Sequence, residues 1–84
     1  MKWTNWAGNQ VARPETIEDP ADEVAVAALV ARAHASGRAV RVAASGHSFT
    51  AAAVTDDLMV RIGGLQGIRS IDRAAMTVTV GAGT

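Results

Sequence analysis

The sequence has no cysteine among its 84 residues. Disulfide bridges, thiol nucleophiles and cysteine-ligated metal sites are therefore excluded, and the composition suits a reducing, cytoplasmic setting. A chain this short buries only a modest core, so without disulfides its margin of stability is expected to be thin. Length and composition predict one small domain, or one part of a larger domain.

Excess charge and long apolar runs are also missing. Eight basic and eight acidic residues give a formal net charge of zero, so no basic surface predicts binding to nucleic acid. The longest apolar run, residues 24–31, is too short to cross a bilayer, and residues 1–10 lack the apolar core of a signal peptide. We therefore expect a soluble, cytoplasmic protein, with peripheral membrane association as the alternative.

One helix is expected between residues 19 and 37. Asp19 can cap it, Pro20 suits the first helical position, and Gly37 suits a left-handed stop. The helical spacing of a buried stripe is followed by Val26, Leu29, Val30 and Ala33.

Strand-like patterns surround this helix. Strands are expected over residues 11–14, 39–43, 57–62, 68–72 and 76–80, with a turn at 73–75. The order β-α-β-β-β-β predicts an α+β fold with one helix packed on a small mixed sheet. The strands on either side of the helix are expected to be parallel neighbours joined by a right-handed crossover. The last residues, TVTVGAGT, read as a strand entering a glycine turn, so we expect the front of a longer protein.

The turn after the second strand is the candidate site. It contains Ala43, Ala44, Ser45, Gly46, His47 and Ser48. Small residues let a backbone approach a phosphate group closely, and successive N–H groups can form an anion-binding nest with serine hydroxyls as further donors. The sequence matches neither the dinucleotide fingerprint nor the P-loop. The alternative is a turn whose serines cap their own backbone.

His47 has several chemical uses at the tip of this turn. A metal site needs two or three converging ligands, and the only other histidine, His34, is expected on the helix surface, so no metal is expected. A nucleophile pair with Ser45 or Ser48 lacks a third, orienting group. A neutral imidazole beside a phosphate nest can also act as a nucleophile toward a bound electrophile.

Two segments together resemble a known family. The opening WTNWAGNQ (residues 3–10) and the turn SGHS (residues 45–48) resemble the N-terminal part of FAD-linked oxidases with a vanillyl-alcohol-oxidase (PCMH)-type FAD domain. TDDLMVRIGGLQGIRSID and TVTVGAGT extend the resemblance over essentially the whole chain. Within the family the chain looks most like the sugar-lactone branch of L-gulonolactone and D-arabinono-1,4-lactone oxidases, with alditol oxidases close by.

The resemblance implies that residues 1–84 are the first subdomain of a PCMH-type FAD-binding domain, without the rest of that domain and without the substrate domain. The loop from Ala43 to Ser48 would bind the FAD pyrophosphate through backbone donors, and His47 would be bonded to the 8α-methyl carbon of the isoalloxazine. No residue here is assigned a catalytic role. The whole protein would oxidise a sugar lactone or polyol, whereas this part alone, lacking its C-terminal partner segment, is expected to be inactive. A non-catalytic truncated remnant and a small α/β interaction domain without cofactor are the alternatives.

Ala44 departs from the family pattern, which carries glycine there. Its methyl group is expected either to crowd the phosphate or to conflict with a positive φ. Trp3 and Trp6 are expected to pack the N-terminus onto the missing part of the protein rather than to touch a ligand. The segment VGAGT is expected either to line the cofactor or to form a plain turn.

Overall fold

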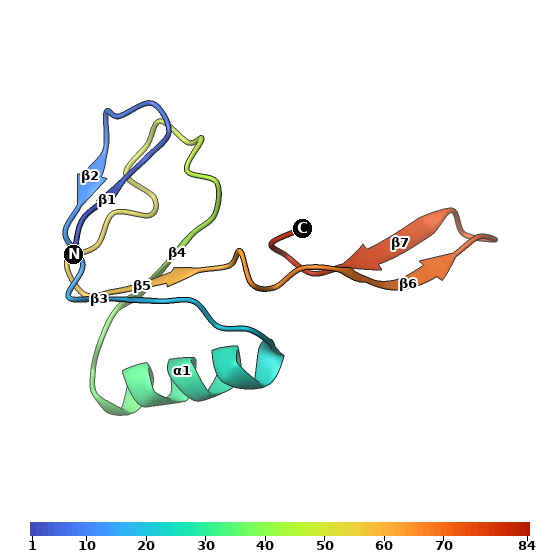
Figure 1. Ribbon diagram of the computed structural model, residues 1–84. Helices are drawn as coiled ribbons and strands as arrows, with labels where there is room; N and C mark the ends of the chain where they lie inside the picture. Colours follow the sequence, from blue (N-terminus) through green and yellow to red (C-terminus); the bar gives the residue numbers. More distant parts are fainter.

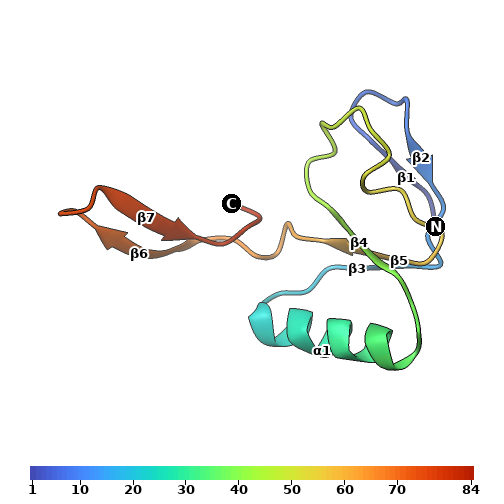
Figure 2. The same ribbon diagram turned by 180° about the vertical axis from the view of Figure 1, so that it is seen from behind.

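A computed structural model describes residues 1–84. It contains one helix, α1 (Glu23–Ala35), and seven short strands. The strands are β1 (Trp3–Thr4), β2 (Val11–Ala12), β3 (Thr16–Glu18), β4 (Val40–Ala43), β5 (Leu58–Arg61), β6 (Ile68–Asp72) and β7 (Thr77–Val80). Figure 1 shows α1 on one face of a central sheet, and β1 and β2 with the loop after β4 on the other face. The β6–β7 hairpin projects to one side, as the reverse view in Figure 2 also shows.

The central sheet is parallel and has the order β3-β5-β4. Leu58 of β5 aligns with Thr16 of β3 on one side and with Val40 of β4 on the other. The strands before and after α1 are therefore parallel, as predicted. The prediction that they are neighbours is wrong, because β5 lies between them.

Strand β5 is buried because a layer of the chain covers each of its faces. Leu58 and Val60 face α1, Met59 faces the opposite layer, and all three are at most 5% exposed. The helix-side cluster consists of Leu29, Ala33, Leu58 and Val60, and the opposite cluster of Ala12, Ala43 and Met59. A parallel strand that is covered on both faces has a continuous apolar run, and the sequence Leu-Met-Val is such a run.

The start of the helix differs from the prediction. The Asp22 carboxylate accepts a hydrogen bond from the Ala25 N–H at 2.7 Å, so Asp22 is the N-cap. The assignment of Asp19 as the cap, with Pro20 at the first helical position, is wrong. Asp19 instead binds Arg61 at the end of β5. Asp22 is the next carboxylate along the chain, and it caps the helix.

The end of the helix follows the prediction, because Gly37 has a φ of 67° and stops it. The buried stripe is narrower than expected. Leu29 and Ala33 are buried, Val26 is half-buried, and Val30 is 48% exposed. A sheet of three short strands covers only the middle of the predicted apolar face.

The expected first strand, residues 11–14, is shorter than predicted, and a separate strand follows it. Val11 and Ala12 pair with β1, and the chain joins the central sheet only from Thr16. The buried Pro14 lies between them and cannot donate a ladder hydrogen bond. The strands thus fall into three small sheets, and the α+β class with a single helix is confirmed.

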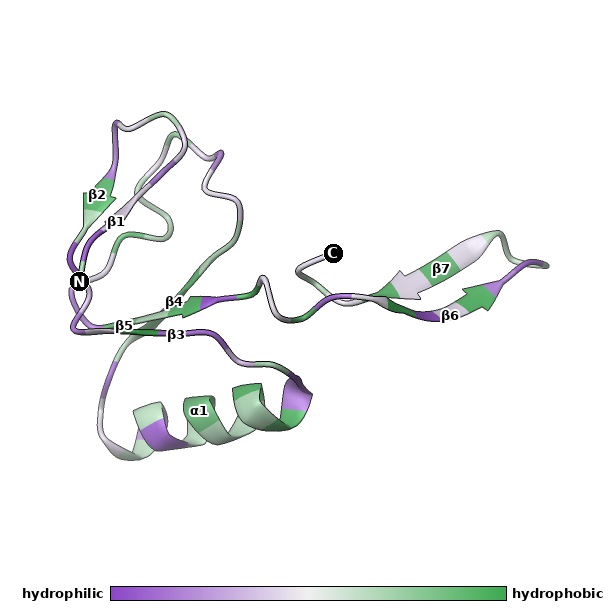
Figure 3. Ribbon diagram, in the orientation of Figure 1, coloured by the Kyte–Doolittle hydropathy of each residue, from purple (hydrophilic) through white to green (hydrophobic).

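Strands β6 and β7 form an antiparallel hairpin, as their alternating sequence predicts. Every residue of both strands is exposed. Figure 3 shows apolar residues alternating with more polar ones along β7. The chain's helix, α1, has 13 residues and is neither long nor apolar enough to cross a membrane.

Candidate functional site

The carboxyl ends of β4 and β5 lie at the same edge of the parallel sheet, where open α/β sheets commonly bind ligands. The loop that leaves β4 separates two hollows there. One has a volume of about 320 Å³ and lies between the loop and Trp3. The other has a volume of about 300 Å³ and lies between the start of the loop and the segments after β5 and β7. The first hollow is lined by all the predicted site residues, Ala43, Ala44, Ser45, Gly46, His47 and Ser48.

The backbone of this loop requires glycine at one position. Gly46 has a φ of 73°, and a Cβ there would lie 3.3 Å from the Trp3 ring and 3.4 Å from the Asn5 Cα. Only glycine combines that φ with so close an approach. Ala44 has no positive φ, so the expected conflict between its side chain and the backbone does not arise.

The N-terminal segment Trp3–Gln10, which we call the strap, binds the carbonyl groups of the loop. The Trp6 N–H donates to the Gly46 carbonyl at 2.7 Å. The Asn5 side chain donates to the Ser48 carbonyl at 2.9 Å. The carbonyl of the next residue, Phe49, accepts from the side chains of Asn9 and Gln10 at 3.1 and 3.3 Å.

The N–H groups at the turn of the loop, unlike its carbonyls, have no partner within the chain. Within the chain, the N–H groups of residues 45–48 donate no hydrogen bond, whereas the carbonyls of residues 46, 48 and 49 all accept one. A run of free N–H groups beside a hollow is the arrangement of an anion-binding nest. The Ser48 hydroxyl bonds to Thr50 at 3.0 Å, so this serine caps its own turn, as the alternative interpretation expected, and Ser45 is the serine left with a free hydroxyl.

His47 is exposed and lies against one aromatic ring. Its imidazole stacks on the Trp6 indole, with ring centroids 5.2 Å apart and planes 22° from parallel. The Ser48 hydroxyl turns to Thr50 rather than to the imidazole, so no serine–histidine nucleophile pair forms. The two ring nitrogens are left free to meet a ligand in the hollow.

The second hollow contains an ion pair. The Arg61 guanidinium donates two hydrogen bonds of 2.7 Å to the Asp19 carboxylate. These bonds, aided by the charge of Arg61, lower the pKa of Asp19 against the opposing effect of desolvation. The same hydrogen bonding raises the pKa of Arg61. A cation beside the nest is therefore present but already partnered.

The VGAGT segment closes this second hollow. The Gly83 N–H donates to the Leu65 carbonyl at 2.8 Å, and the Gly81 N–H donates to the Gly67 carbonyl at 2.9 Å. A Cβ on Gly83 would collide with the Ile62 carbonyl, so a side chain is excluded there. The segment therefore lines the edge that the nest occupies, rather than forming an isolated turn.

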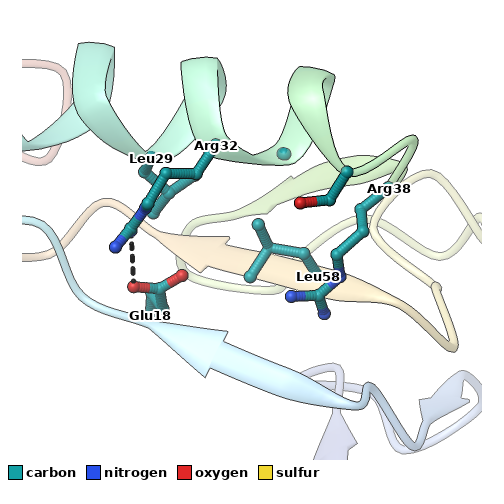
Figure 4. Close-up of a pocket in the computed structure, with 7 residues that line it drawn as sticks. Glu18, Leu29, Arg32, Arg38 and Leu58 are labelled. Atoms are coloured by element: carbon teal, nitrogen blue, oxygen red, sulfur yellow. Dashed lines mark hydrogen bonds and ion pairs between the residues drawn. The ribbon is translucent and has the colours of Figure 1, made fainter.

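A further hollow, of about 260 Å³, lies between α1 and the central sheet (Figure 4). Its two arginines are already paired: Arg32 lies 3.2 Å from Glu18, and Arg38 lies 2.7 Å from Asp57. It is on the helix side of the sheet, away from the His47 loop. We therefore assign it to the packing of α1 rather than to ligand binding.

The strap was the part of the site that sequence reasoning missed. Trp3 packs within this chain, on the Met59 side of the sheet, and Trp6 stacks on His47. Both rings thus have contacts within this chain, and the prediction that they pack against the missing part of the protein stays a prediction, with Trp6 still 70% exposed. The signal was present in the WTNWAGNQ opening, whose two asparagines and glutamine have side-chain amides able to bind backbone groups.

A model of the FAD binding domain family matches residues 11–84. The chain belongs to this family. The assignment made from residues 3–10 and 45–48 is thereby confirmed, together with FAD as the cofactor of the fold. The cofactor-free interaction domain is disfavoured.

Known relatives narrow the family further. The chain is 42% identical over 81 residues to an L-gulono-1,4-lactone dehydrogenase of Mycobacterium tuberculosis, covering 96% of this chain and 19% of the relative. It is 37% identical over 83 residues to a D-arabinono-1,4-lactone oxidase of Eremothecium gossypii, covering 94% of this chain and 16% of that protein. An alditol oxidase of a Streptomyces species is 39% identical over 88 residues, and the match covers 95% of this chain and 19% of that protein. The resemblance to the sugar-lactone branch is confirmed, and the chain spans less than a fifth of the length of these curated relatives.

Proposed function

We propose that this chain is the N-terminal FAD-binding part of a flavin-dependent oxidoreductase that oxidises a sugar lactone of the L-gulono-1,4-lactone or D-arabinono-1,4-lactone type. The observation that carries the proposal is the loop after β4, whose carbonyls are bound by the strap and whose N–H groups at residues 45–48 are free. The printed names of the relatives in M. tuberculosis and E. gossypii supply the substrate class.

The loop suits the pyrophosphate of FAD. Consecutive backbone N–H groups and the Ser45 hydroxyl offer neutral donors to an anion, and such donors need no reorganisation when they are already aimed at it. The Ala44 side chain lines both hollows. We infer that it narrows the approach of a phosphate without preventing it, since its backbone is unstrained.

His47 is proposed as the residue that bonds to the 8α-methyl carbon of the isoalloxazine. The ring is exposed, lies at the first hollow and has free nitrogens. Such a bond would replace one hydrogen of the imidazole and one of the methyl group. The flavin would supply the two-electron oxidation that this requires, and a two-electron acceptor such as dioxygen would then have to reoxidise it.

In the whole protein, the flavin would accept the hydride of the substrate's carbinol carbon. The residues that bind the lactone and take the hydroxyl proton would lie outside this chain, which offers none at the site. The relatives include both a dehydrogenase and oxidases by name, so the electron acceptor is left open. An acyclic polyol is the second candidate substrate, favoured by the 39% identity to an alditol oxidase.

The test uses the complete gene product. Purified protein is assayed with L-gulono-1,4-lactone, D-arabinono-1,4-lactone and xylitol, and the denatured band is inspected for flavin fluorescence. We expect turnover of a lactone, a fluorescent band in the unsubstituted protein, and no fluorescent band in His47→Ala. His47→Ala should still bind FAD reversibly, because the nest donors are backbone groups. A fluorescent His47→Ala band would show that the linkage lies elsewhere, and turnover of xylitol alone would replace the lactone assignment.

A further inference from the structure

The strap Trp3–Gln10 lies outside the residues that the FAD binding domain model matches, yet it makes the contacts that shape the flavin loop. We propose that Asn5 and Trp6 are positioning residues: Asn5 fixes the loop backbone, and Trp6 holds the His47 imidazole in place before the cofactor arrives. The inference deepens the proposed function and rests on it for the role of His47.

Asn5 is a buried polar residue, only 4% exposed, with every hydrogen-bonding group of its amide used. Its Nδ2 donates to the Ser48 carbonyl at 2.9 Å and to the Asn9 side chain at 2.6 Å. Its Oδ1 accepts from the Gln10 N–H at 3.0 Å. One side chain thus links the turn of the strap to the carbonyl of Ser48, the residue after His47.

The Asn5 bond also fixes which way the loop peptides face. A peptide whose carbonyl points to the strap must direct its N–H group to the opposite side, because the peptide unit is planar and trans. The Trp6 N–H applies the same constraint at the Gly46 carbonyl, at 2.7 Å, and the N–H group of that peptide belongs to His47. The Asn5 bond acts on the peptide between Ser48 and Phe49. The two bonds therefore orient one N–H group inside the nest and the N–H group that directly follows it.

Trp6 acts on the side chain rather than on the backbone. Its indole is 70% exposed, so it contributes little to a core, but it covers one face of the His47 imidazole at a centroid distance of 5.2 Å. Neither ring nitrogen is held by a hydrogen bond to a neighbouring serine. The stack is the contact that restrains the ring, and it leaves the ring edge, where the nitrogens lie, open to a ligand.

Restraint of this kind affects the rate of bond formation more than cofactor affinity. A nucleophile held near its reacting geometry gains an entropic advantage that a freely rotating side chain lacks. Reversible FAD binding depends on the backbone nest, which Trp6 contacts only through its own N–H, and substitution of the side chain leaves that N–H in place.

The experiment uses the complete gene product, prepared as apoprotein from a riboflavin-limited host, with the variants Trp6→Ala, Trp6→Phe and Asn5→Asp. Each is mixed with saturating FAD. Flavin fluorescence in solution reports reversible binding, and fluorescence of the denatured band reports covalent incorporation. Hydrogen exchange of the peptide spanning residues 44–50 reports loop order without any flavin, and circular dichroism checks the fold.

We expect Trp6→Ala to slow covalent incorporation by about tenfold or more while the Kd for FAD changes by less than about threefold, since only the ring restraint is lost. Trp6→Phe keeps an aromatic face and should restore most of the rate. Asn5→Asp keeps the size of the side chain but places a carboxylate oxygen against the Ser48 carbonyl. It should therefore speed exchange over residues 44–50 and weaken FAD binding.

Incorporation at the normal rate in Trp6→Ala, or normal exchange and binding in Asn5→Asp, would overturn the proposal. A uniform loss of rate, affinity and fold in both Trp6 variants would also overturn it, since that pattern marks a purely structural residue. If the unsubstituted protein takes up no covalent flavin, the proposed linkage fails. The exchange data then decide the inference on their own: faster exchange in Asn5→Asp supports the strap, and unchanged exchange refutes it.

Discussion

Strand β5 and the β6–β7 hairpin have different sequence patterns and opposite surroundings. β5 is a continuous apolar run whose Leu58, Met59 and Val60 are at most 5% exposed. The hairpin alternates apolar and polar residues, and its Val78 and Val80 are 54% and 43% exposed. The difference lies in the layers around them: α1 and the strap side cover the two faces of β5, and nothing in this chain covers the hairpin. The continuous apolar run of β5 matches its two covered faces, whereas the alternating hairpin has apolar residues that nothing in this chain covers.

The hairpin is nevertheless built with one apolar face. Ile71 lies opposite Val78, and Ile68 lies opposite Val80. Ile68 and Ile71 are three residues apart and would point to opposite faces of a regular strand. The irregularity between Ile68 and Ser70 corrects the alternation, as a bulge does. Because the relatives are about five times longer than this chain, we expect the apolar face to pack against residues of the complete domain.

The largest expected effect is the loss of stability when a core side chain of β5 is removed, compared with removal of an exposed side chain of the hairpin. In the isolated 84-residue chain, Met59→Ala should cost about 2–5 kcal/mol, since Met59 is fully buried and its removal leaves a cavity. Val78→Ala should change stability by less than about 0.5 kcal/mol there, since its side chain is exposed. In the complete gene product both should destabilise. The measurement is urea unfolding followed by circular dichroism, and an unchanged Val78→Ala in the complete product would mean that the hairpin stays uncovered.

The same contrast explains which parts of the fold the sequence could predict. The hairpin strands and the Gly37 stop depend on neighbouring residues, so local pattern sufficed for them. The position of β5 between β3 and β4, and the choice of Asp22 over Asp19 as the cap, depend on partners far along the chain. Arg61, for instance, lies 42 residues from Asp19, and no local pattern records that pairing.

The site divides in the same way. The turn around His47 was recognisable because small residues and glycine follow a strand directly. The strap's role was not, because Asn5 meets Ser48 across 43 residues, and only the folded chain brings them together. A conflict with a positive φ was one of the two effects considered for Ala44, but the positive φ of this loop falls at Gly46. A turn that contains a glycine limits which residue can have a positive φ. The exact position of that residue depends on what packs against the turn, which here is Trp3.

A second prediction concerns association of the isolated chain, which we expect to self-associate through the uncovered hairpin and to lack oxidase activity. Ile71→Lys places a charge on the apolar face and should weaken association by about 1.5–3 kcal/mol, the value of burying one such side chain. Sedimentation over a concentration series measures it. Arg73→Ala, in the hairpin turn, serves as the control and should leave association unchanged. An isolated chain that stays monomeric at high concentration, or that turns over a lactone, would contradict this view of the fragment.

A third prediction compares two glycines with similar backbones. Gly46 and Gly8 have φ values of 73° and 76°, but only Gly46 has neighbours within 4 Å of a new Cβ. Gly8→Ala should cost about 1–2 kcal/mol for the left-handed backbone alone. Gly46→Ala should cost more, because the Trp3 ring must also move, and should weaken FAD binding in the complete gene product. Met76 holds a φ of 56° in the hairpin with its side chain 90% exposed, which illustrates that such a backbone is tolerated where nothing lies close.

The smallest expected effect on stability comes from the ion pairs at the starts of β4 and β5 and between β6 and α1. Arg38 and Asp57 join the starts of β4 and β5 at 2.7 Å with side chains 29% and 26% exposed, whereas Arg69 and Glu23 join β6 to α1 with side chains 52% and 74% exposed. The hydrogen bond from Arg38, followed by the bond from the Ala39 N–H, lowers the pKa of Asp57 against the opposing effect of desolvation. A carboxyl group whose pKa is lowered by folding stabilises the folded protein at pH values above the pKa of that group in the unfolded chain. This contribution disappears as the pH falls through the pKa of the group in the folded protein.

The stability difference between the unsubstituted protein and Asp57→Asn should therefore be largest near neutral pH and shrink as the pH falls below about 4, the ordinary pKa of an aspartate. Urea midpoints measured across this range test it. Glu23→Gln should lower the midpoint only slightly at any pH, because exposed pairs contribute little to stability. Asp19→Asn should change with pH in the same direction as Asp57→Asn, since Arg61 lowers the pKa of Asp19 by the same kind of bond, but by less, because the side chains of that pair are 53% and 50% exposed. A difference for Asp57→Asn that stayed constant down to the lowest pH would mean that the negative charge of Asp57 contributes nothing to the stability of this junction.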